Sequence, residues 1–343
     1  MEANENVQAK WKEILLKYLP YIFVGFVVLC IGLSMIGPFF EIRLKEDGQK
    51  IDTIYRLTDL LFSHPAGGIV QIFFIFNYLV LPLVGCACIL LARFHKNFYV
   101  VSVLLFILVG ITSILSNEIF AEALVYKTDL DYSTHGVGFC CVLSIVTFFI
   151  AGLASLAIAS SKVKISVEDL TEMGVLVGLA LVLNFIKVPI GDTGGSINFQ
   201  MLPLFILALR KGPLKGFVGA GIAYGLISCI TDGYGIATYP FDYLLAFGST
   251  CILGFFTPYI FGENQETYNF KGELFLFVGA LLATIFRFIG GCASSMIIYG
   301  YSLTAAMAYN AIYVSVSSAI SIAVIMGIYG PFIKVNKRFP SAN

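Results

Sequence analysis

Long apolar runs dominate this chain of 343 residues and limit its possible folds more than any other feature. Several of them exceed the roughly 20 residues that a helix needs to cross the hydrocarbon core of a bilayer. Only 12% of the residues are charged, whereas about 25% are charged in an average soluble domain. Backbone polar groups find no water inside a bilayer, so single segments that cross it must be helical. The sequence therefore predicts an all-α polytopic membrane protein.

The apolar runs predict about ten transmembrane helices. The predicted spans are residues 19–40, 67–92, 98–116, 135–160, 170–188, 197–210, 214–231, 241–261, 273–298 and 304–331. A polar stretch at 161–169 separates the fourth span from the fifth, and Ser166 with Asp169 fits a capping box that opens the next helix. We therefore expect a four-helix membrane domain over 1–164 and a six-helix domain over 165–343.

Basic residues in the short loops predict the orientation in the membrane, because Lys and Arg are enriched in cytoplasmic loops. With ten spans, the clusters after spans two, four, six and ten share one side. Those clusters are Arg93 and Lys96, then Lys162 and Lys164, then Arg210, Lys211 and Lys215, and finally Lys334, Lys337 and Arg338. We expect this side to be the cytoplasmic face of the cell membrane, with both termini inside and the loop at 41–66 outside.

Several kinds of chemistry find no support in the sequence. The net charge is zero, which argues against a nucleic-acid partner. The 8 cysteines all fall inside apolar runs without zinc-site spacing, so we interpret them as packing residues. Walker A, HExxH and GxSxG motifs are missing from the sequence. The sequence thus predicts no enzyme, no metal site and no cofactor, and ATP hydrolysis would need other subunits.

Polar residues within or beside the apolar segments of the second half are the candidates for function, because burying them in a membrane is costly. The first group lies in the loop 190–200, which carries Asn198 and is interrupted by Gly191, Gly194 and Gly195. This loop is either an ordinary polar connection or a mobile lid over a site.

The second group is the segment "YPFDYLLAF", where Asp242 lies among Tyr239, Phe241 and Tyr243. A carboxylate among aromatic rings suits a flat organic cation, because the rings stack on the cation and the carboxylate neutralises it. The alternative is that Asp242 only caps its own helix.

The remaining candidates lie in the last two spans. Arg287 falls near the middle of span nine, where it is either functional or a structural partner of Asp242 or of backbone carbonyls. Tyr299, Tyr309 and Asn310 lie across the last outer loop and span ten. An aromatic belt at the membrane interface is the alternative for these tyrosines. Under the predicted topology, every candidate except Arg287 lies near the outer end of its span.

From residue 170 to about residue 340, the chain resembles the thiamine-specific substrate-binding (S) component of energy-coupling factor (ECF) transporters. The segments that carry the resemblance are "LTEMGVLVGLALVL", "LPLFILALRKGPLKGFVGAGIAYG" and "FDYLLAFGSTCILGFF". The resemblance implies a six-helix bundle that binds a small vitamin and is energised by a coupling transmembrane subunit and two ATPase subunits. It also implies that Gly174 and Gly178 pack against the coupling subunit.

The resemblance further implies pocket residues. The family's pocket glutamate and the tyrosine after it correspond to Asp242 and Tyr243. The remaining aromatic positions of the family pocket correspond to Tyr224, Tyr299 and Tyr309. With Asn198, Asn310 and Tyr239 from the polar groups above, these are the expected ligand-binding residues.

The chain also departs from the family pattern. Gly194, Gly291 and Val314 stand where the family has a pocket tryptophan, histidine and asparagine, although Asn310 lies one turn from Val314. The expected ligand is therefore thiamine or a thiamine-related compound. The alternatives are an autonomous secondary transporter for another small vitamin or organic cation, and a membrane scaffold. The resemblance assigns no role to the first four spans.

Overall fold

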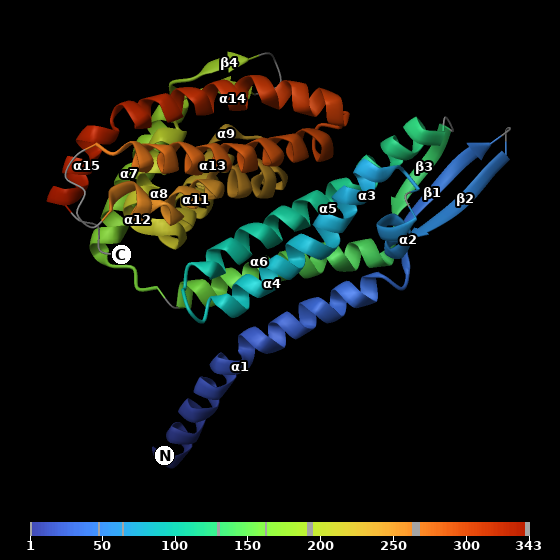
Figure 1. Cartoon of the computed structure of the whole chain (residues 1–343), viewed down its shortest axis with the longest axis horizontal. Coiled ribbons are helices and arrows are strands. Elements are labelled where there is room, and N and C mark those ends of the chain that lie inside the picture. Colours follow the sequence, from blue (N-terminus) through green and yellow to red (C-terminus); the bar gives the residue numbers. More distant parts are fainter. Residues whose placement is uncertain are drawn as a thin grey trace. The chain divides into compact units, whose positions relative to one another are not determined.

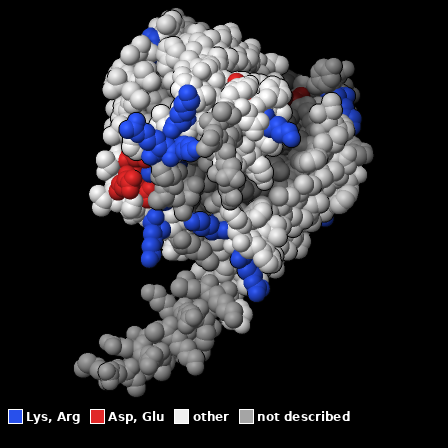
Figure 2. Space-filling model, turned by 60° about the vertical axis from the view of Figure 1, so that its left-hand side comes forward, with Lys and Arg blue, Asp and Glu red and all other residues white. Residues whose placement is uncertain are grey.

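The computed structural model describes residues 2–46, 49–63, 65–128, 131–161, 163–190, 195–262 and 268–339. The chain divides into two compact units, Met1–Ala159 and Ser160–Asn343, and most of both is helical (Figure 1). Figure 2 displays a face that is mostly neither acidic nor basic. These features confirm the predicted class of multi-pass, helical membrane protein.

Among the described residues, 7 helices are long and apolar enough to cross a membrane. They are Gly68–Leu91, Phe98–Val125, Phe139–Ser161, Met201–Asp232, Ile236–Phe255, Phe270–Ile297 and Leu303–Gly327. The apolar part of the first helix, Tyr18–Ser34, is shorter. The count of ten spans stays a prediction.

Long helices form most of the first unit. Its helical elements are α1 (Glu2–Ser34), α2 (Leu57–Phe62), α3 (Gly68–Ile75), the π-helical turn η1 (Phe76–Val80), α4 (Leu81–Leu91), α5 (Phe98–Thr128) and α6 (Phe139–Ser161). Helix α5 continues well past residue 116, where the sequence predicted its end. Small residues join α5 to α6, since the hydroxyls of Ser102 and Ser155 lie 3.1 Å apart.

The first unit also contains a three-stranded antiparallel sheet, which the all-helical prediction missed. Its strands are β1 (Pro38–Glu46), β2 (Gln49–Arg56) and β3 (Asp131–Val137), in the order β2-β1-β3. The prediction that the first span extends to residue 40 is therefore wrong, as is the start of the fourth span at residue 135. Phe39 and Phe40 prolong the apolar run, but they are fully buried against protein and do not extend the first helix. The Phe40 ring stacks on the Phe120 ring, with 5.3 Å between the ring centroids.

The second unit consists of helical segments and one short hairpin. Its elements are α7 (Val167–Phe185), β4 (Val188–Ile190), β5 (Gly195–Ile197), α8 (Met201–Phe217), η2 (Val218–Tyr224), α9 (Gly225–Asp232), η3 (Ile236–Thr238), η4 (Tyr239–Leu245), α10 (Ala246–Gly248), η5 (Ser249–Cys251), α11 (Ile252–Phe255), α12 (Thr257–Phe261), α13 (Phe270–Ile297), α14 (Leu303–Gly327) and α15 (Tyr329–Arg338). Helices α13 and α14 run side by side (Figure 1).

A sharp turn divides α8 into two helical segments. Gly212 has a φ of 73°, a left-handed value that favours glycine, and the next residue, Pro213, cannot continue the hydrogen-bond ladder of the preceding helix. The break falls between the predicted spans 197–210 and 214–231. The sequence therefore located this turn correctly.

An ion-pair cluster fastens the start of α7 to that turn. Ser166 and Asp169 form the predicted capping box, with the Ser166 hydroxyl accepting a 3.1 Å hydrogen bond from the Asp169 backbone N–H. The Asp169 carboxylate also pairs with Lys211 at 3.2 Å and with Lys215 at 2.8 Å. The other end of α7, near Asn184, lines a cavity at the opposite end of the bundle.

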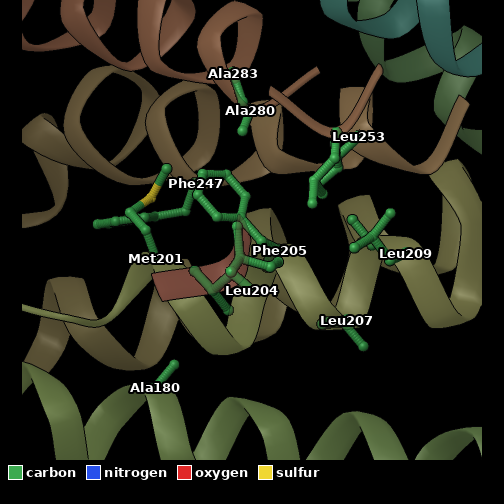
Figure 3. Packing of buried hydrophobic residues seen from close by; sticks show 14 of the residues in the cluster. Ala180, Met201, Leu204, Phe205, Leu207, Leu209, Phe247, Leu253, Ala280 and Ala283 are labelled. Atoms are coloured by element: carbon green, nitrogen blue, oxygen red, sulfur yellow. The ribbon is translucent and has the colours of Figure 1, made fainter. Parts of the chain in front are cut away.

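The core of the second unit packs large side chains against small ones. Figure 3 shows Phe205, Leu209 and Phe247 among the buried residues of one cluster, with Ala280 and Ala283 projecting from α13. Glycines allow a close approach elsewhere in this unit. A Cβ atom on Gly221 would lie only 2.9 Å from the Cα of Gly248. Such small residues let membrane helices come into backbone contact.

Candidate functional site

A polar cavity lies in the second unit, at the end of the bundle opposite the ion-pair cluster. Its lining comes from the end of α7, the strand β5 and the turn before α8, the end of α9, η4 and α10, the second half of α13 and the first turns of α14. The lining residues are Asn184, Lys187, Gly195, Ser196, Asn198, Gln200, Asp232, Tyr234, Asp242, Tyr243, Ala246, Phe247, Arg287, Gly291, Ser294, Ser295, Tyr299, Tyr309 and Tyr313. Side chains from segments up to 129 positions apart in the sequence thus converge on one space, from Asn184 to Tyr313.

Asp242 is a partly buried carboxylate of this cavity and lies in the π-helical turn η4. Turns of this kind are frequent at functional sites. The Ser294 hydroxyl of α13 donates a 2.5 Å hydrogen bond to Asp242 Oδ2. The alternative that Asp242 caps its own helix is not supported, because the carboxylate lines the cavity and binds α13.

Aromatic side chains form much of the cavity wall. Tyr243 and Phe247 come from the helical segment that carries Asp242, and their ring centroids lie 6.1 Å apart. Tyr309 and Tyr313 of α14 lie on one helix face with their centroids 5.2 Å apart, and Tyr299 lies at 44% exposure just after α13. The cavity therefore offers several faces on which a flat ring can stack.

Five of the eight residues expected to bind ligand line this cavity. They are Asp242, Tyr243, Tyr299, Tyr309 and Asn198. The structure thus brings together residues that the sequence placed in three separate segments.

The other three expected residues lie behind the wall and support it. Tyr224 is fully buried, donates a hydrogen bond to the Gln200 side chain and meets Phe247 edge to face. Asn310 is also fully buried and accepts a 2.8 Å hydrogen bond from the Tyr313 hydroxyl. The Tyr239 hydroxyl donates a 3.1 Å hydrogen bond to the Gly221 carbonyl.

Asp232 is a lining residue that the sequence reasoning missed. It ends α9, and its Oδ2 accepts hydrogen bonds from the hydroxyls of Tyr243 and Ser228, each at 3.2 Å. Its Oδ1 pairs with Lys187 at 3.6 Å. A carboxylate at the C-terminal, negative end of a helix dipole is unfavourable. The position of Asp232 directly before Gly233, which ends α9, was therefore the sequence signal for a functional residue.

Arg287 also lines the cavity, although the sequence placed it apart from the other candidates. Its side chain is 5% exposed, and its guanidinium carbon lies 5.4 Å from the centroid of the Phe247 ring. Within the part of the chain that the structure describes, Nη1 has no hydrogen-bond partner. Arg287 therefore brings a buried, unpartnered donor to the cavity wall.

The positions that depart from the family pattern have different surroundings. Gly194 lies outside the described residues, as do Gly191, Asp192 and Thr193 of the expected lid, whereas Gly195 and Ser196 line the cavity. A Cβ atom on Gly291 would lie 2.2 Å from Asn310 Oδ1, so no larger side chain fits there without a shift. Val314 is buried and does not line the cavity.

Gly174 and Gly178 lie along one open side of α7. A Cβ atom at either position would meet nothing within 4 Å. The neighbouring Val175 and Leu179 are 65% and 45% exposed. This surface is therefore available to lipid or to a second protein.

Together, the helical fold and the polar cavity are those of a membrane protein with a candidate solute-binding site. Residues 170–337 match the family model described as "Thiamine transporter protein". The chain is 27% identical over 179 residues to the thiamine transporter ThiT of Bacillus subtilis (strain 168), covering 46% of this chain and 87% of that protein. A solved structure of ThiT from Listeria monocytogenes is 21% identical, with a TM-score of 0.41, over 50% of this chain and 95% of that one.

Residues 170–337 are thus similar to the thiamine transporter protein family. The resemblance predicted from the sequence is thereby confirmed over this part of the chain. The family is one of transporters and not of enzymes.

Proposed function

We propose that the second unit is the membrane-embedded S component of an ECF-type vitamin transporter and binds thiamine or a thiamine-related compound. The observation that carries this proposal is the cavity around Asp242, which lies within the segment that matches the thiamine transporter family model. The Bacillus subtilis relative is named a thiamine transporter, which supports the same ligand class.

The chemistry of the cavity fits such a ligand. Thiamine joins a flat aminopyrimidine to a thiazolium ring. The Ser294 hydroxyl donates its hydrogen bond to Oδ2 of Asp242. The Oδ1 atom of the same carboxylate can therefore accept a hydrogen bond from the amine. Tyr243, Phe247 and Tyr309 offer ring faces for stacking, an interaction that contributes about 0.5–1.5 kcal/mol for an aromatic pair.

We also propose an orientation and a set of partners. The cavity and the basic turn at Arg210 and Lys211 lie at opposite ends of the bundle, so a cytoplasmic turn directs the cavity outward. Both termini are then cytoplasmic. The open side of α7 at Gly174 and Gly178 packs on the coupling subunit, and two ATPase subunits supply the energy.

The division of labour within the chain is part of the proposal. Residues 165–343 form the binding domain, and residues 1–164 form an additional four-helix membrane domain. The compact units Met1–Ala159 and Ser160–Asn343 support this division.

Two measurements test the proposal. Isothermal titration of the full chain in detergent, with thiamine and with its two ring halves, should give saturable binding of at least one compound. Uptake into proteoliposomes should require ATP, the coupling subunit and the ATPases. A folded chain that binds none of these compounds would defeat the ligand proposal. Uptake by the chain alone, driven by an ion gradient, would instead favour a secondary transporter.

A further inference from the structure

The charged residues of the cavity balance one another. Among the described lining residues, Asp232 and Asp242 are acidic, and Lys187 and Arg287 are basic. Lys187 pairs with Asp232 at 3.6 Å, so these two charges largely satisfy each other. Asp242 and Arg287 remain as one negative and one positive group on the same cavity. The formal charge of the lining is therefore zero before any ligand enters.

Two buried polar atoms of the cavity wall have no partner among the described residues. One is a donor, Arg287 Nη1, and the other is an acceptor, Asn198 Oδ1. Both side chains are more than nine-tenths buried, with 5% of Arg287 and 3% of Asn198 exposed. Burying such groups unpaired is costly. A ligand that supplies an acceptor to Arg287 and a donor to Asn198 removes that cost.

A permanent cation fits this pattern poorly. A positive ring in the cavity would add a charge that the lining does not balance, and an unbalanced charge at low dielectric is expensive. It would also bring a like charge toward Arg287, whose guanidinium already lies against the Phe247 ring at 5.4 Å. A neutral ring with both donors and acceptors adds no charge and can satisfy Asp242, Arg287 and Asn198.

We propose that the cavity selects a net-neutral aminopyrimidine, of the kind that forms one half of thiamine, over the thiamine cation. The exocyclic amine donates to Asp242, and a ring nitrogen or a hydroxyl accepts from Arg287. The ring stacks against the aromatic wall that includes Tyr243 and Phe247. This inference rests on the proposed function and sharpens it by setting the charge of the preferred ligand.

The test is a pair of titrations at pH 8, where an aminopyrimidine is uncharged. The full chain in detergent is titrated with thiamine and with 4-amino-5-hydroxymethyl-2-methylpyrimidine. We expect the neutral compound to bind at least about tenfold more tightly, a difference of about 1.4 kcal/mol. Tighter binding of thiamine would overturn this inference and leave the proposed function standing. Binding of neither compound by folded protein would overturn both.

Variants at Arg287 test the cause of the selectivity. Arg287→Met keeps much of the length but removes the charge, which leaves the lining with a net negative charge. We expect this variant to shift the ratio of the two dissociation constants toward thiamine by at least about tenfold. Arg287→Lys keeps the charge and should keep the preference. An unchanged ratio of dissociation constants in folded Arg287→Met would contradict the role of the Arg287 charge in selectivity. If that variant does not fold, the ratio measured for the wild type still tests whether the cavity prefers the neutral compound.

Discussion

Ser294 donates a 2.5 Å hydrogen bond to the Asp242 carboxylate and so ties α13 to the π-helical turn η4. The two residues are 52 positions apart in the sequence. The bond fixes one carboxylate oxygen and leaves the other able to accept a hydrogen bond from a ligand. The site therefore depends on how α13 packs against η4.

Removing this hydrogen bond should weaken ligand binding. Hydrogen bonds to charged groups contribute roughly 1.5–3 kcal/mol, so Ser294→Ala should raise the dissociation constant about tenfold or more. Titration calorimetry on the purified protein measures the change. Thr284→Ala is the matched control, because the Thr284 hydroxyl donates its hydrogen bond to the Ala280 carbonyl of the same helix, at 2.9 Å. Equal losses in both variants would contradict a specific role for Ser294.

A single methyl group at Gly291 should disturb the cavity wall. The new Cβ atom would lie 2.2 Å from Asn310 Oδ1 and would displace the amide that holds Tyr313. Overpacking of this kind costs about 1–3 kcal/mol. We expect Gly291→Ala to lower both the melting temperature and the affinity for ligand. Gly327→Ala, which meets no atom within 4 Å, should change neither. Similar behaviour of the two variants would contradict the described packing.

The open side of α7 should matter for transport and not for binding. Replacing Gly174 and Gly178 by leucine fills a surface on which a Cβ atom meets nothing within 4 Å. We expect the double variant to bind ligand as the wild type does and to lose ATP-driven uptake in the reconstituted complex. Gly32→Leu, at an equally open position in α1, is the control. Full uptake by the double variant would remove α7 from the proposed interface.

The ion-pair cluster at the other end of the bundle should contribute to stability. Asp169 is 2% exposed and pairs with both Lys211 and Lys215. Asp169→Ala leaves the buried ammonium of Lys215 without its counterion, and breaking such a pair costs roughly 3 kcal/mol. Thermal unfolding in detergent should show a clear drop in melting temperature. Asp52→Ala, which removes an exposed ion pair with Arg43, should have little effect. A melting temperature as high in Asp169→Ala as in the wild type would contradict this role.

The sequence predicted those features of the fold that local rules determine. The apolar runs identified the membrane class, and Ser166 with Asp169 marked the start of α7. The sheet in the first unit was missed because "PFFEIRLKE" follows an apolar run directly, and its two phenylalanines prolonged that run. The alternation of Phe40, Ile42 and Leu44 with charged residues was the strand signal.

The cavity shows a similar division. Asp242 and its neighbouring tyrosines stood out because a carboxylate beside an apolar run is unusual. Whether an aromatic lines the cavity or supports it depends on packing between distant helices, so Tyr224 and Tyr309 could not be told apart from sequence alone. The sequence placed Arg287 deep in span nine, away from the other candidates, because it could not show that the guanidinium packs against Phe247 of α10.

The central claim is that the cavity around Asp242 binds a thiamine-related compound, and one titration tests it most directly. The wild-type chain and Asp242→Asn, which keeps the shape of the side chain and removes its charge, are titrated with thiamine and with its aminopyrimidine half. We predict saturable binding of at least one compound to the wild type, with an affinity about tenfold to a hundredfold lower in the variant. Asp52→Asn, on the sheet of the first unit, should bind as the wild type does. Equal affinities in the wild type and in folded Asp242→Asn would contradict the claim.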